Sequence, residues 1–503
     1  MVSALRDLSR LQAPGLGLFG SAGLLFSDAV FGRDSVAAAE TLLHLRPEIT
    51  HDVILTLARF QGTADTPSGP HSNEEERGKI HHEHRSLYVG SRRISASSEA
   101  LLHELARKWG GDITSLTYYG ASDTTPLYAR LLARWCATFG EAILTETVTR
   151  HDGSVVTIRE SLGAAMGWIT RKLDGSELGL IEFQRRNPDG IPFQAWKDSG
   201  TSYIHRDGAL ANWDAPMAPI EVQGYAYDAL LGAAEVLGGT DWRERAEVLR
   251  ERVLTQLWMP SEGYFAMGLD RDALGRPRWI DSSASNGALV LDTRLFDDLQ
   301  GAEGYVEGLV GRICSADFVT EVGIRCRSRT ERDLVAFQDY HGAWAVWPKE
   351  TFEVARGLRR QGLHRLSRQL GDRLLNAVNV AGANVEFLYV SPDASVMYDI
   401  AGRDPRGGGS LEIAGTNHPE SPQAWTVTAA LALKRGHITD HAMAGGGWRD
   451  ALDIDVLSRM DRVEAFRTGS QLEAAYANRG DFHLNLELGQ ERDRRARLTR
   501  RGS

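Results

Sequence analysis

A carboxylate lies beside an indole and an ammonium group in residues 194–199, whose sequence is QAWKDS. The indole of Trp196 would lower the local dielectric constant, which raises the pKa of a nearby carboxyl and favours a proton donor at Asp198. Its flat apolar face could also stack against a sugar ring. Lys197 would oppose the pKa shift if its ammonium group pointed at the same carboxylate, and it is a further candidate for substrate binding. A solvated Asp198 beside a core tryptophan is the simpler interpretation of the segment taken alone.

Two more carboxylates lie in residues 410–425 (SLEIAGTNHPESPQAW), before a helix that we expect to begin near Pro422. Proline is well placed in a first helical turn. Hydrolysis of a glycosidic bond with inversion needs one protonated carboxyl that donates to the leaving oxygen. It also needs one ionised carboxylate that activates water on the opposite face of the ring. Asp198 and Glu412 could form that pair if the fold brings them together.

Four further segments carry polar or aromatic side chains that could contact a ligand: residues 31–35, 118–126, 221–227 and 340–348. Their candidate binding residues are Arg33, Asp34, Tyr119, Asp123, Glu221, Gln223, Tyr340, His341 and Trp344. Asp34 or Ser35 could instead cap the helix that follows. The indoles of residues 340–348 could be stacking surfaces for a ligand or ordinary core side chains. Both interpretations stay open at this stage.

Residues 78–85 (GKIHHEHR) contain three histidines and a glutamate, which suggests a metal site at first sight. Nothing else in the chain supplies partners with the spacing of metal ligands, so we expect no metal. The sequence also has no G-x-x-x-x-G-K-[ST] segment, no G-x-S-x-G segment and no convincing G-x-G-x-x-G segment after a strand. These absences argue against a P-loop ATPase, an α/β-hydrolase and a Rossmann dehydrogenase, and we expect no cofactor.

The composition excludes several classes of partner. The net charge of −10 and the pI of about 5.9 argue against nucleic acid, since phosphates are neutralised by clustered Lys and Arg. Three cysteines are too few and too scattered for a disulfide framework or a zinc site. The N-terminus has no continuous apolar stretch of the secretory kind, and no apolar run is long enough to cross a membrane. We therefore expect a cytoplasmic protein with no nucleic-acid or membrane partner, and its charge is compatible with an uncharged substrate such as a sugar.

Helical patterns dominate the chain, with apolar residues spaced three or four apart. About twelve helices are predicted, mostly in pairs, and short strands are expected near residues 264–267 and 387–390. The predicted helices span residues 35–45, 49–60, 97–109, 126–139, 158–173, 222–237, 243–257, 286–291, 303–314, 344–358, 363–380 and 422–434.

The connections between these helices are long at residues 62–79, 182–218, 315–340 and 394–421, and they are rich in Gly, Pro, Trp, His and acidic residues. Long connections in a compact domain are usually functional. Paired helices with such loops suit an all-α toroid in which an inner ring of helices is wrapped by an outer ring. We predict an N-terminal extension over residues 1–30, a catalytic domain over 31–440 and a helical or flexible tail over 441–503.

The order of the motifs resembles that of amylo-α-1,6-glucosidases, the glucosidase part of glycogen debranching enzymes. The motifs are FGRDS, GKIHHEHR, YYGASDTTPLY, QAWKDS, EVQGYAYDAL, GIR, YHGAWAVWP and PQAW, and they span roughly residues 32–434. The resemblance implies an (α/α)6 toroid, an inverting mechanism and α-glucoside substrates. The chain departs from the family in having WPKET where the family often has WPHDN. It also begins almost directly with the barrel, which favours a small glucoside over a branched polymer.

Residue by residue, the resemblance implies that Asp198 is the general acid and that Glu412 is the general base, with Glu420 as its substitute. It also implies that Arg33 and Asp34 bind the sugar. Two further roles follow from the same alignment: Trp196 resembles the stacking platform, and Tyr119 and Asp123 match a second subsite.

Three alternatives to an α-1,6-glucosidase remain open. The first is a hydrolase of a small α-glucosylated solute or disaccharide of the trehalose, sucrose or glucosylglycerate type. A basic set near the leaving group would favour glycerate, and Arg77, Lys79 and Arg85 are candidates for it. The second is a sugar epimerase that transfers protons through histidines, for which His81, His82, His84, His341 and His418 are available. The third is a non-catalytic sugar-binding protein.

Overall fold

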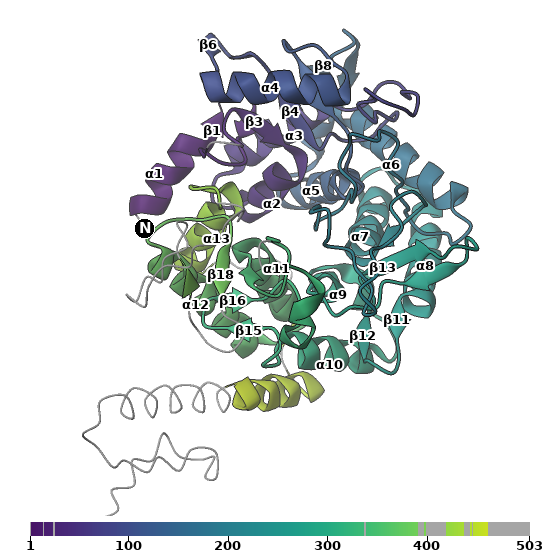
Figure 1. The fold of residues 1–503 in the computed structure, drawn as a ribbon, viewed down its shortest axis with the longest axis vertical. Coiled ribbons are helices and arrows are strands. Elements are labelled where there is room, and N and C mark those ends of the chain that lie inside the picture. The colour runs from purple at the N-terminus through teal and green to yellow at the C-terminus, as the bar shows by residue number, and fades with distance from the viewer. Residues whose placement is uncertain are drawn as a thin grey trace, which may run out of the picture.

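The computed structural model describes residues 2–13, 15–23, 26–336, 339–390, 397–398, 419–436, 443–444 and 446–460. Over these residues the helices follow one another around a ring (Figure 1). The inner layer of the ring consists of α2 (Gly32–Leu42), α5 (Thr124–Phe139), α7 (Ile220–Val236), α9 (Asn286–Leu289), α11 (Pro348–Arg360) and α13 (Ala424–Arg435). Each of these helices contacts the next, and α13 packs against α2, which closes the ring.

Each inner helix packs against an outer helix. The outer helices, in the same order, are α3 (Pro47–Arg59), α6 (Ile158–Gly175), α8 (Asp241–Gln256), α10 (Ala302–Ile313), α12 (His364–Ala381) and α1 (Val2–Leu11). The first five follow their inner partner in the chain, whereas α1 comes from the N-terminus and packs on α13. Six helical hairpins arranged in this way are an (α/α)6 toroid, so the predicted fold class is confirmed.

The two layers differ in sequence for a physical reason. Nearly every residue of α7 is buried, including small ones such as Gly224 and Gly232, because the helix is covered on all sides. A Cβ at Gly232 would lie only 2.4 Å from the Cβ of Ala133 on α5, so this glycine lets the two inner helices approach closely. The outer helix α8 buries only Ala246, Leu249 and Val253, which form a single stripe at three-to-four spacing.

Short antiparallel strands sit between the helices and fix the connections. One three-stranded sheet joins β3 (Ala29–Phe31), β4 (Glu83–Arg85) and β7 (Leu116–Tyr118), and β3 runs directly into α2. A second joins β17 (Ala345–Val346), β18 (Leu388–Val390) and β19 (Met397–Tyr398). A third joins β10 (Ala218–Pro219), β13 (Gly268–Arg271) and β14 (Pro277–Trp279). The first two sheets carry the segments that form the candidate site.

The remaining short elements are hairpins and single turns. The paired strands are β1 (Gln12–Ala13) with β2 (Gly17–Leu18), β5 (Tyr88–Val89) with β6 (Arg92–Arg93), β8 (Thr147–Thr149) with β9 (Val155–Thr157), β11 (Trp258–Met259) with β12 (Tyr264–Phe265), and β15 (Val319–Thr320) with β16 (Gly323–Ile324). The 3-10 helices are η1 (Glu141–Thr145), η2 (Val290–Asp292), η3 (Arg294–Phe296) and η4 (Arg329–Leu334). Helix α4 (Ala96–Trp109) packs on β7. The predicted strands near residues 264–267 and 387–390 correspond to β12 and β18.

Some predicted helix boundaries were wrong. Residues 344–347 are not helical: Ala345 and Val346 form β17, and the helix starts at Pro348, where proline fits the first turn. Helix α2 starts three residues before the predicted Ser35, so neither Asp34 nor Ser35 is its cap; the N-cap is Phe31, with no side-chain hydrogen bond. Helix α1 was missed.

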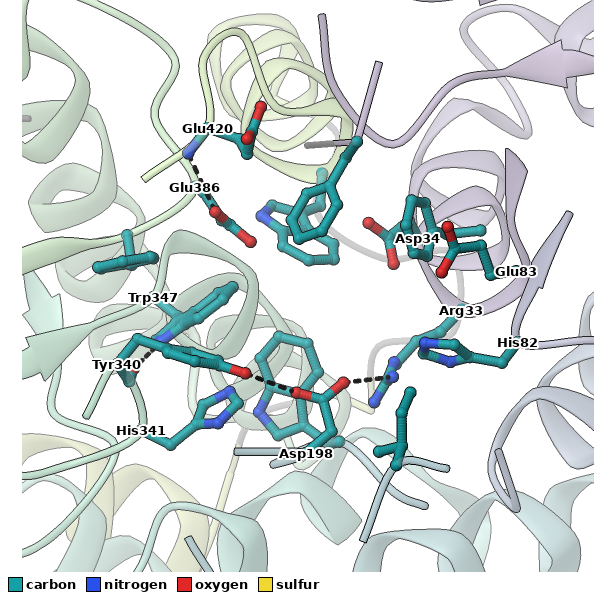
Figure 2. A pocket seen from close by; sticks show the side chains of 16 residues that line it. Arg33, Asp34, His82, Glu83, Asp198, Tyr340, His341, Trp347, Glu386 and Glu420 are labelled. Atoms are coloured by element: carbon teal, nitrogen blue, oxygen red, sulfur yellow. Dashed lines mark hydrogen bonds and ion pairs between the residues drawn. The ribbon is translucent and has the colours of Figure 1, made fainter. Parts of the chain in front are cut away.

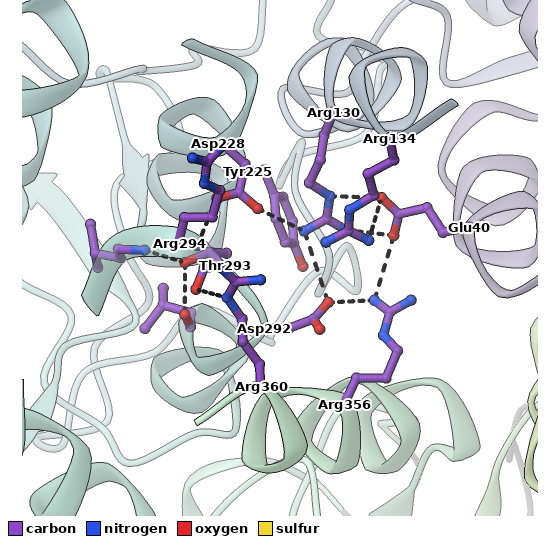
Figure 3. Close-up of polar contacts among 12 residues, drawn as sticks. Glu40, Arg130, Arg134, Tyr225, Asp228, Asp292, Thr293, Arg294, Arg356 and Arg360 are labelled. Atoms are coloured by element: carbon purple, nitrogen blue, oxygen red, sulfur yellow. Dashed lines mark hydrogen bonds and ion pairs between the residues drawn. The ribbon is translucent and has the colours of Figure 1, made fainter. Parts of the chain in front are cut away.

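A buried cluster of charged side chains joins the inner helices (Figure 3). Glu40 of α2 accepts two hydrogen bonds of 2.7 Å from Arg130 of α5, and its pKa falls to about 2, because the ion pairs with three arginines outweigh the opposing effect of burial. Arg356 of α11 contacts both Glu40 and Asp292, at 3.5 and 2.5 Å. Because an unpaired buried charge costs several kcal/mol, about 3–5 for loss of one partner, this inner-ring ion cluster holds α2, α5, η2 and α11 in one arrangement.

The described part of the predicted tail also packs on the toroid. Residues 448–460 are helical, and Leu452, Val456 and Met460 are buried in the main core. The carboxylate of Asp453 accepts hydrogen bonds of 2.9 Å from the backbone N–H groups of Arg365 and Leu366 at the start of α12. None of the helices in the described ranges is long and apolar enough to cross a membrane. The three cysteines are buried and unpaired.

Candidate active site

A cavity of about 290 Å³ opens among the loops that lead into α2, α11 and α13 (Figure 2). Its lining comes from segments far apart in the sequence, gathered by the first two sheets. The lining residues are Phe26, Phe31, Arg33, Asp34, His82, Glu83, Ile191, Trp196, Asp198, Tyr340, His341, Trp347, Glu386, Phe387, Glu420 and Trp425. Seven of them were predicted from the sequence: Arg33, Asp34, Trp196, Asp198, Tyr340, His341 and Glu420.

Asp198 is held between two donors. One of its carboxylate oxygens accepts a hydrogen bond of 3.2 Å from the Tyr340 hydroxyl, and the other lies 3.3 Å from the guanidinium of Arg33. Burial raises the pKa of Asp198, and the charge of Asp123 adds to this, while Arg33 and Tyr340 lower it by less. The net shift is upward, which is the direction that a proton donor needs.

Arg33 is fixed by its own partners before any ligand arrives. It donates to the backbone carbonyl of Ala195 at 2.6 Å, forms an ion pair with buried Asp123 at 3.2 Å, and lies over the Trp196 ring at 5.4 Å. Burial lowers its pKa, but Asp123 and Asp198 raise it by more, so the guanidinium stays charged. The side chain therefore positions Asp198 and the 195–198 segment.

Three carboxyl groups stand on the other side of the cavity from Asp198 (Figure 2). Glu386 and Glu420 are joined through the backbone: the N–H of Glu386 donates to the carbonyl of Glu420 at 2.9 Å, and the N–H of Glu420 donates to the Glu386 carboxylate at 3.0 Å. The carboxylate of Glu420 accepts a hydrogen bond of 2.8 Å from the Ser21 hydroxyl. The third carboxyl, Asp34, accepts a hydrogen bond of 3.4 Å from the Gln423 side chain.

Burial and the neighbouring charges change the proton affinity of two of these groups, Glu386 and Asp34. Burial raises the pKa of Glu386 well above its ordinary value, and the charges of Asp34, Glu420 and Asp198 raise it further, against the hydrogen bond from the Glu420 N–H. Burial also raises the pKa of Asp34 to about 7, and Asp198 adds to it, although Arg33 opposes the shift. In Figure 2 the Glu386 carboxylate points into the cavity, whereas that of Glu420 is turned away from it.

Aromatic rings make up most of the remaining wall. The Trp196 ring meets Trp347 and Trp425 edge-on at centroid distances of 5.2 and 5.6 Å. The Trp347 ring in turn stacks on His341 at 5.1 Å and on Phe387 at 5.0 Å. Flat apolar walls with a few convergent polar groups are typical of ligand pockets.

Lys197 faces away from Asp198. Its ammonium group is fully buried and donates to Glu350, whose same oxygen also accepts from the Trp196 indole N–H and the Ser285 hydroxyl, both at 2.6 Å. The predicted opposition between Lys197 and the Asp198 carboxyl therefore does not arise. Through these hydrogen bonds Glu350 anchors the segment that carries Trp196 and Asp198.

Five other predicted site residues do not line the cavity. Asp123 pairs with Arg33 behind it, and Glu221 accepts a hydrogen bond of 3.1 Å from Tyr203 in the core. The side-chain amide of Gln223 is hydrogen-bonded to the backbone of Ile181 and Pro219. The Tyr119 hydroxyl donates to the Phe60 carbonyl at 3.0 Å. The fifth is Trp344. Glu412 lies outside the described residues.

Sequence reasoning did not assign Glu386, Glu83, Trp347 or Trp425 to the substrate site, and it considered His82 only for a metal or for proton transfer in an epimerase. The two tryptophans lie inside segments that were singled out, YHGAWAVWP and PQAW, so their signal was present. Glu386 lies in NVEFLY, where nothing but a strand was expected. Its position just before β18, which pairs with β17, brings it opposite Asp198.

The histidine-rich segment is buried rather than arranged for a metal. His82 lines the cavity, and the ring of His84 stacks on Phe60 at 3.6 Å. Burial lowers the pKa of His81 to about 3 and those of His82 and His341 well below their ordinary value. Across the described ranges, no three His, Cys, Asp or Glu side chains form a group that could hold a metal ion.

Comparison with solved structures finds the same architecture. The GH63 mannosylglycerate hydrolase from Thermus thermophilus in complex with glucose is 15% identical, with a TM-score of 0.55 over 87% of this chain and 99% of that chain. Its complex with Tris and D-glycerate gives 14% identity and a TM-score of 0.53 over 86% and 99%. An uncharacterized conserved protein from the same organism gives 15% and 0.55 over 86% and 99%. At these identities the similarity shows the fold. Neither a family model nor a curated protein matches the sequence.

Proposed function

We propose that the protein is an inverting glycoside hydrolase that cleaves a small α-glucoside. The observation that carries this proposal is the placement of Asp198 and Glu386 on opposite sides of one aromatic-lined cavity (Figure 2). Inverting hydrolysis needs two carboxyl groups that face each other across the scissile bond, with room for a water molecule. The α-glucosidase assignment rests on the sequence resemblance to amylo-α-1,6-glucosidases, and the fold neighbours include a glycoside hydrolase.

In this mechanism Asp198 is the general acid. Its raised pKa keeps a proton available, and that proton passes to the glycosidic oxygen as the bond to the anomeric carbon breaks. Glu386 is the general base: it takes a proton from a water molecule whose oxygen attacks the anomeric carbon from the opposite face. The raised pKa of Glu386 makes its ionised form a stronger proton acceptor. This assignment replaces the predicted base Glu412 and its substitute Glu420.

Tyr340 sets the proton affinity of the acid. Its hydroxyl donates to Asp198 and so favours the ionised carboxylate. The Tyr340→Phe variant should therefore have a higher Asp198 pKa and stay active to higher pH. A hydrogen bond to a charged group is worth about 1.5–3 kcal/mol and one pKa unit is about 1.4 kcal/mol, so we expect the alkaline limb of kcat/KM to move up by about one to two units. An alkaline limb that moves to lower pH would contradict this role.

The size of the cavity favours a small substrate. Its volume of about 290 Å³ lies at the low end of ligand pockets, which span roughly 300–1,000 Å³. A cavity of this size suits one sugar ring and a small leaving group. Isomaltose and other short α-1,6-glucosides fit this requirement better than a branched polymer does.

The charge of the cavity favours an uncharged leaving group. Five carboxyl groups line it, namely Asp34, Glu83, Asp198, Glu386 and Glu420. Among the lining residues that the structure describes, Arg33 is the single Lys or Arg, and it is paired with Asp123 and Asp198. Of the basic residues considered for a glycerate group, Lys79 and Arg77 do not line the cavity, and Arg85 pairs with Glu83. A carboxylate on the leaving group would meet no unpaired Lys or Arg among these lining residues, and it would be repelled by those carboxyl groups of the wall that are ionised.

A matched pair of substrates tests whether the leaving group is uncharged. The complex of the fold neighbour with D-glycerate favours a leaving group that carries a carboxylate. Glucosylglycerol and glucosylglycerate differ only in a hydroxymethyl group and a carboxylate. We expect kcat/KM for glucosylglycerol to exceed that for glucosylglycerate by at least about tenfold, equivalent to about 1.4 kcal/mol. Isomaltose, panose and trehalose complete the panel and identify the linkage. Preference for glucosylglycerate would instead assign a glycerate-type substrate, and no hydrolysis of any of them would reject the proposal.

A further inference from the structure

A second cavity, of about 530 Å³, lies beside the C-terminal end of α6 and shares no lining residue with the candidate active site in the part of the chain that the structure describes. We refer to it as the basic cavity. Five positively charged side chains line it: Lys79, Arg171, Lys172, Arg185 and Arg186. Two carboxylates, Glu76 and Glu182, stand among its described lining residues. The charge at this cavity is therefore opposite in sign to that of the candidate active site.

Glu182 does not offset the basic side chains of the cavity. Its carboxylate accepts a hydrogen bond of 2.5 Å from Arg271, which does not line the cavity, and another of 2.7 Å from the Ser176 hydroxyl. The charge of Glu182 is thus neutralised by Arg271, which lies outside the cavity lining. Arg185 is likewise paired outside the cavity, 3.5 Å from the carboxylate of Asp214, so four basic side chains remain against the carboxylate of Glu76.

Glu76 is shared by three of these four groups. Its oxygens lie 3.2 Å from the Lys79 ammonium, 2.7 Å from that of Lys172 and 4.0 Å from the Arg186 guanidinium. Burial opposes ionisation of Glu76, but these three cations lower its pKa to about 2. One carboxylate neutralises one cation, so the group of four keeps an excess of positive charge. The Arg186 guanidinium also donates to the backbone carbonyls of Thr66 and Glu75, at 2.9 and 3.0 Å, and these carry no net charge.

The excess positive charge destabilises the folded protein, because part of it is buried. Lys79 is almost fully buried, and its pKa is lowered by burial first and then by Lys172 and Arg186, against the attraction of Glu76 and Glu74. A buried charge requires a partner of opposite sign. An anion in the cavity would meet this requirement for Lys79, Lys172 and Arg186 together.

We propose that the basic cavity binds the phosphate group of a small metabolite. A phosphate carries nearly two negative charges at neutral pH and three strong acceptor oxygens, which matches several cations better than a single carboxylate would. Arginine and lysine are the side chains that bind phosphate. The cavity is larger than a phosphate requires, so it has room for the attached sugar or polyol. This site is independent of the proposed hydrolysis.

Calorimetric titration with inorganic phosphate and with glucose 6-phosphate tests the site, at constant ionic strength and with glucose as the uncharged probe. We expect both phosphates to bind with one site per chain and glucose not to bind at this site. Lys172→Gln should weaken phosphate binding at least about tenfold, equivalent to the loss of one charge-assisted contact. Arg171→Gln should also weaken it, and because Arg171 is exposed this variant does not depend on the core.

Lys108→Gln is the control, since it removes an exposed charge from α4 that pairs with Glu104 and does not line the cavity. Its phosphate affinity should equal that of the wild type. Absence of phosphate binding in the wild type would overturn the proposal. So would equal weakening in Lys108→Gln and Lys172→Gln, because that result would mean non-specific attraction by the surface.

Discussion

Replacing Asp198 by Asn is expected to lower kcat on isomaltose or another unactivated glucoside by about 10²–10⁴-fold, the usual contribution of general acid catalysis. The amide has a similar shape, so the hydrogen bond from Tyr340 and the fold should persist. Initial rates measured with a glucose-release assay give the effect. The thermal unfolding midpoint should be close to that of the wild type.

The leaving group distinguishes an acid from a residue that only shapes the site. Fluoride departs with little help from a proton donor, so α-glucosyl fluoride should remain a good substrate of Asp198→Asn. The exposed Asp189→Asn variant is the matched control and should hydrolyse both substrates normally. If Asp198→Asn lost isomaltose and glucosyl fluoride to the same extent, Asp198 would not be the general acid.

Replacing Glu386 by Gln is expected to slow the hydrolysis of both isomaltose and glucosyl fluoride, because attack by water limits both reactions once the base is gone. The expected loss is again about 10²–10⁴-fold or greater. The side-chain amide of the Glu386→Gln variant can still accept the hydrogen bond from the Glu420 N–H through its carbonyl oxygen, so the loop geometry should be kept.

Glu420→Gln provides the contrast, since the group that orients Glu386 is the backbone N–H of residue 420 and survives the substitution. The charge of Glu420 raises the pKa of Glu386, so its removal should lower that pKa. Because the base must be ionised, the acidic limb of the pH profile should then move to lower pH while activity near neutral pH is largely kept. Loss of activity in Glu420→Gln alone would make Glu420 the base, and loss in Glu412→Gln alone would restore the assignment predicted from the sequence.

The fold could be predicted from the sequence because helix periodicity is a local signal. The stripe on α8 and the apolar surround of α7 each indicate a helix and its degree of burial without any tertiary information. The misplaced start of α11 has a local cause as well: an apolar run such as Ala343–Trp347 fits a buried strand or a helix equally. Residues Ala345 and Val346 of this run form a strand because they pair with β18, which lies more than 40 residues later in the chain.

The candidate site was predictable only in part, because convergence across the ring is not a local property. Asp198, Arg33 and Tyr340 stood in segments of unusual composition, and the structure brings all three into contact. Lys197 has the same neighbours in sequence, yet it points to buried Glu350, which the sequence had not linked to it. Glu386 lies in an ordinary apolar strand pattern, and its position in the cavity depends on β17, β18 and the Glu420 backbone contact, which only the folded chain shows.

The most direct test of inversion is proton NMR of the sugar released in the first moments of hydrolysis of an α-glucoside that the substrate panel has identified. We expect β-glucose to appear first and then to equilibrate with α-glucose by mutarotation, because water guided by Glu386 attacks the face opposite the leaving group. Initial appearance of α-glucose would mean retention of configuration and would contradict the assignment of Asp198 and Glu386 as an acid and base pair.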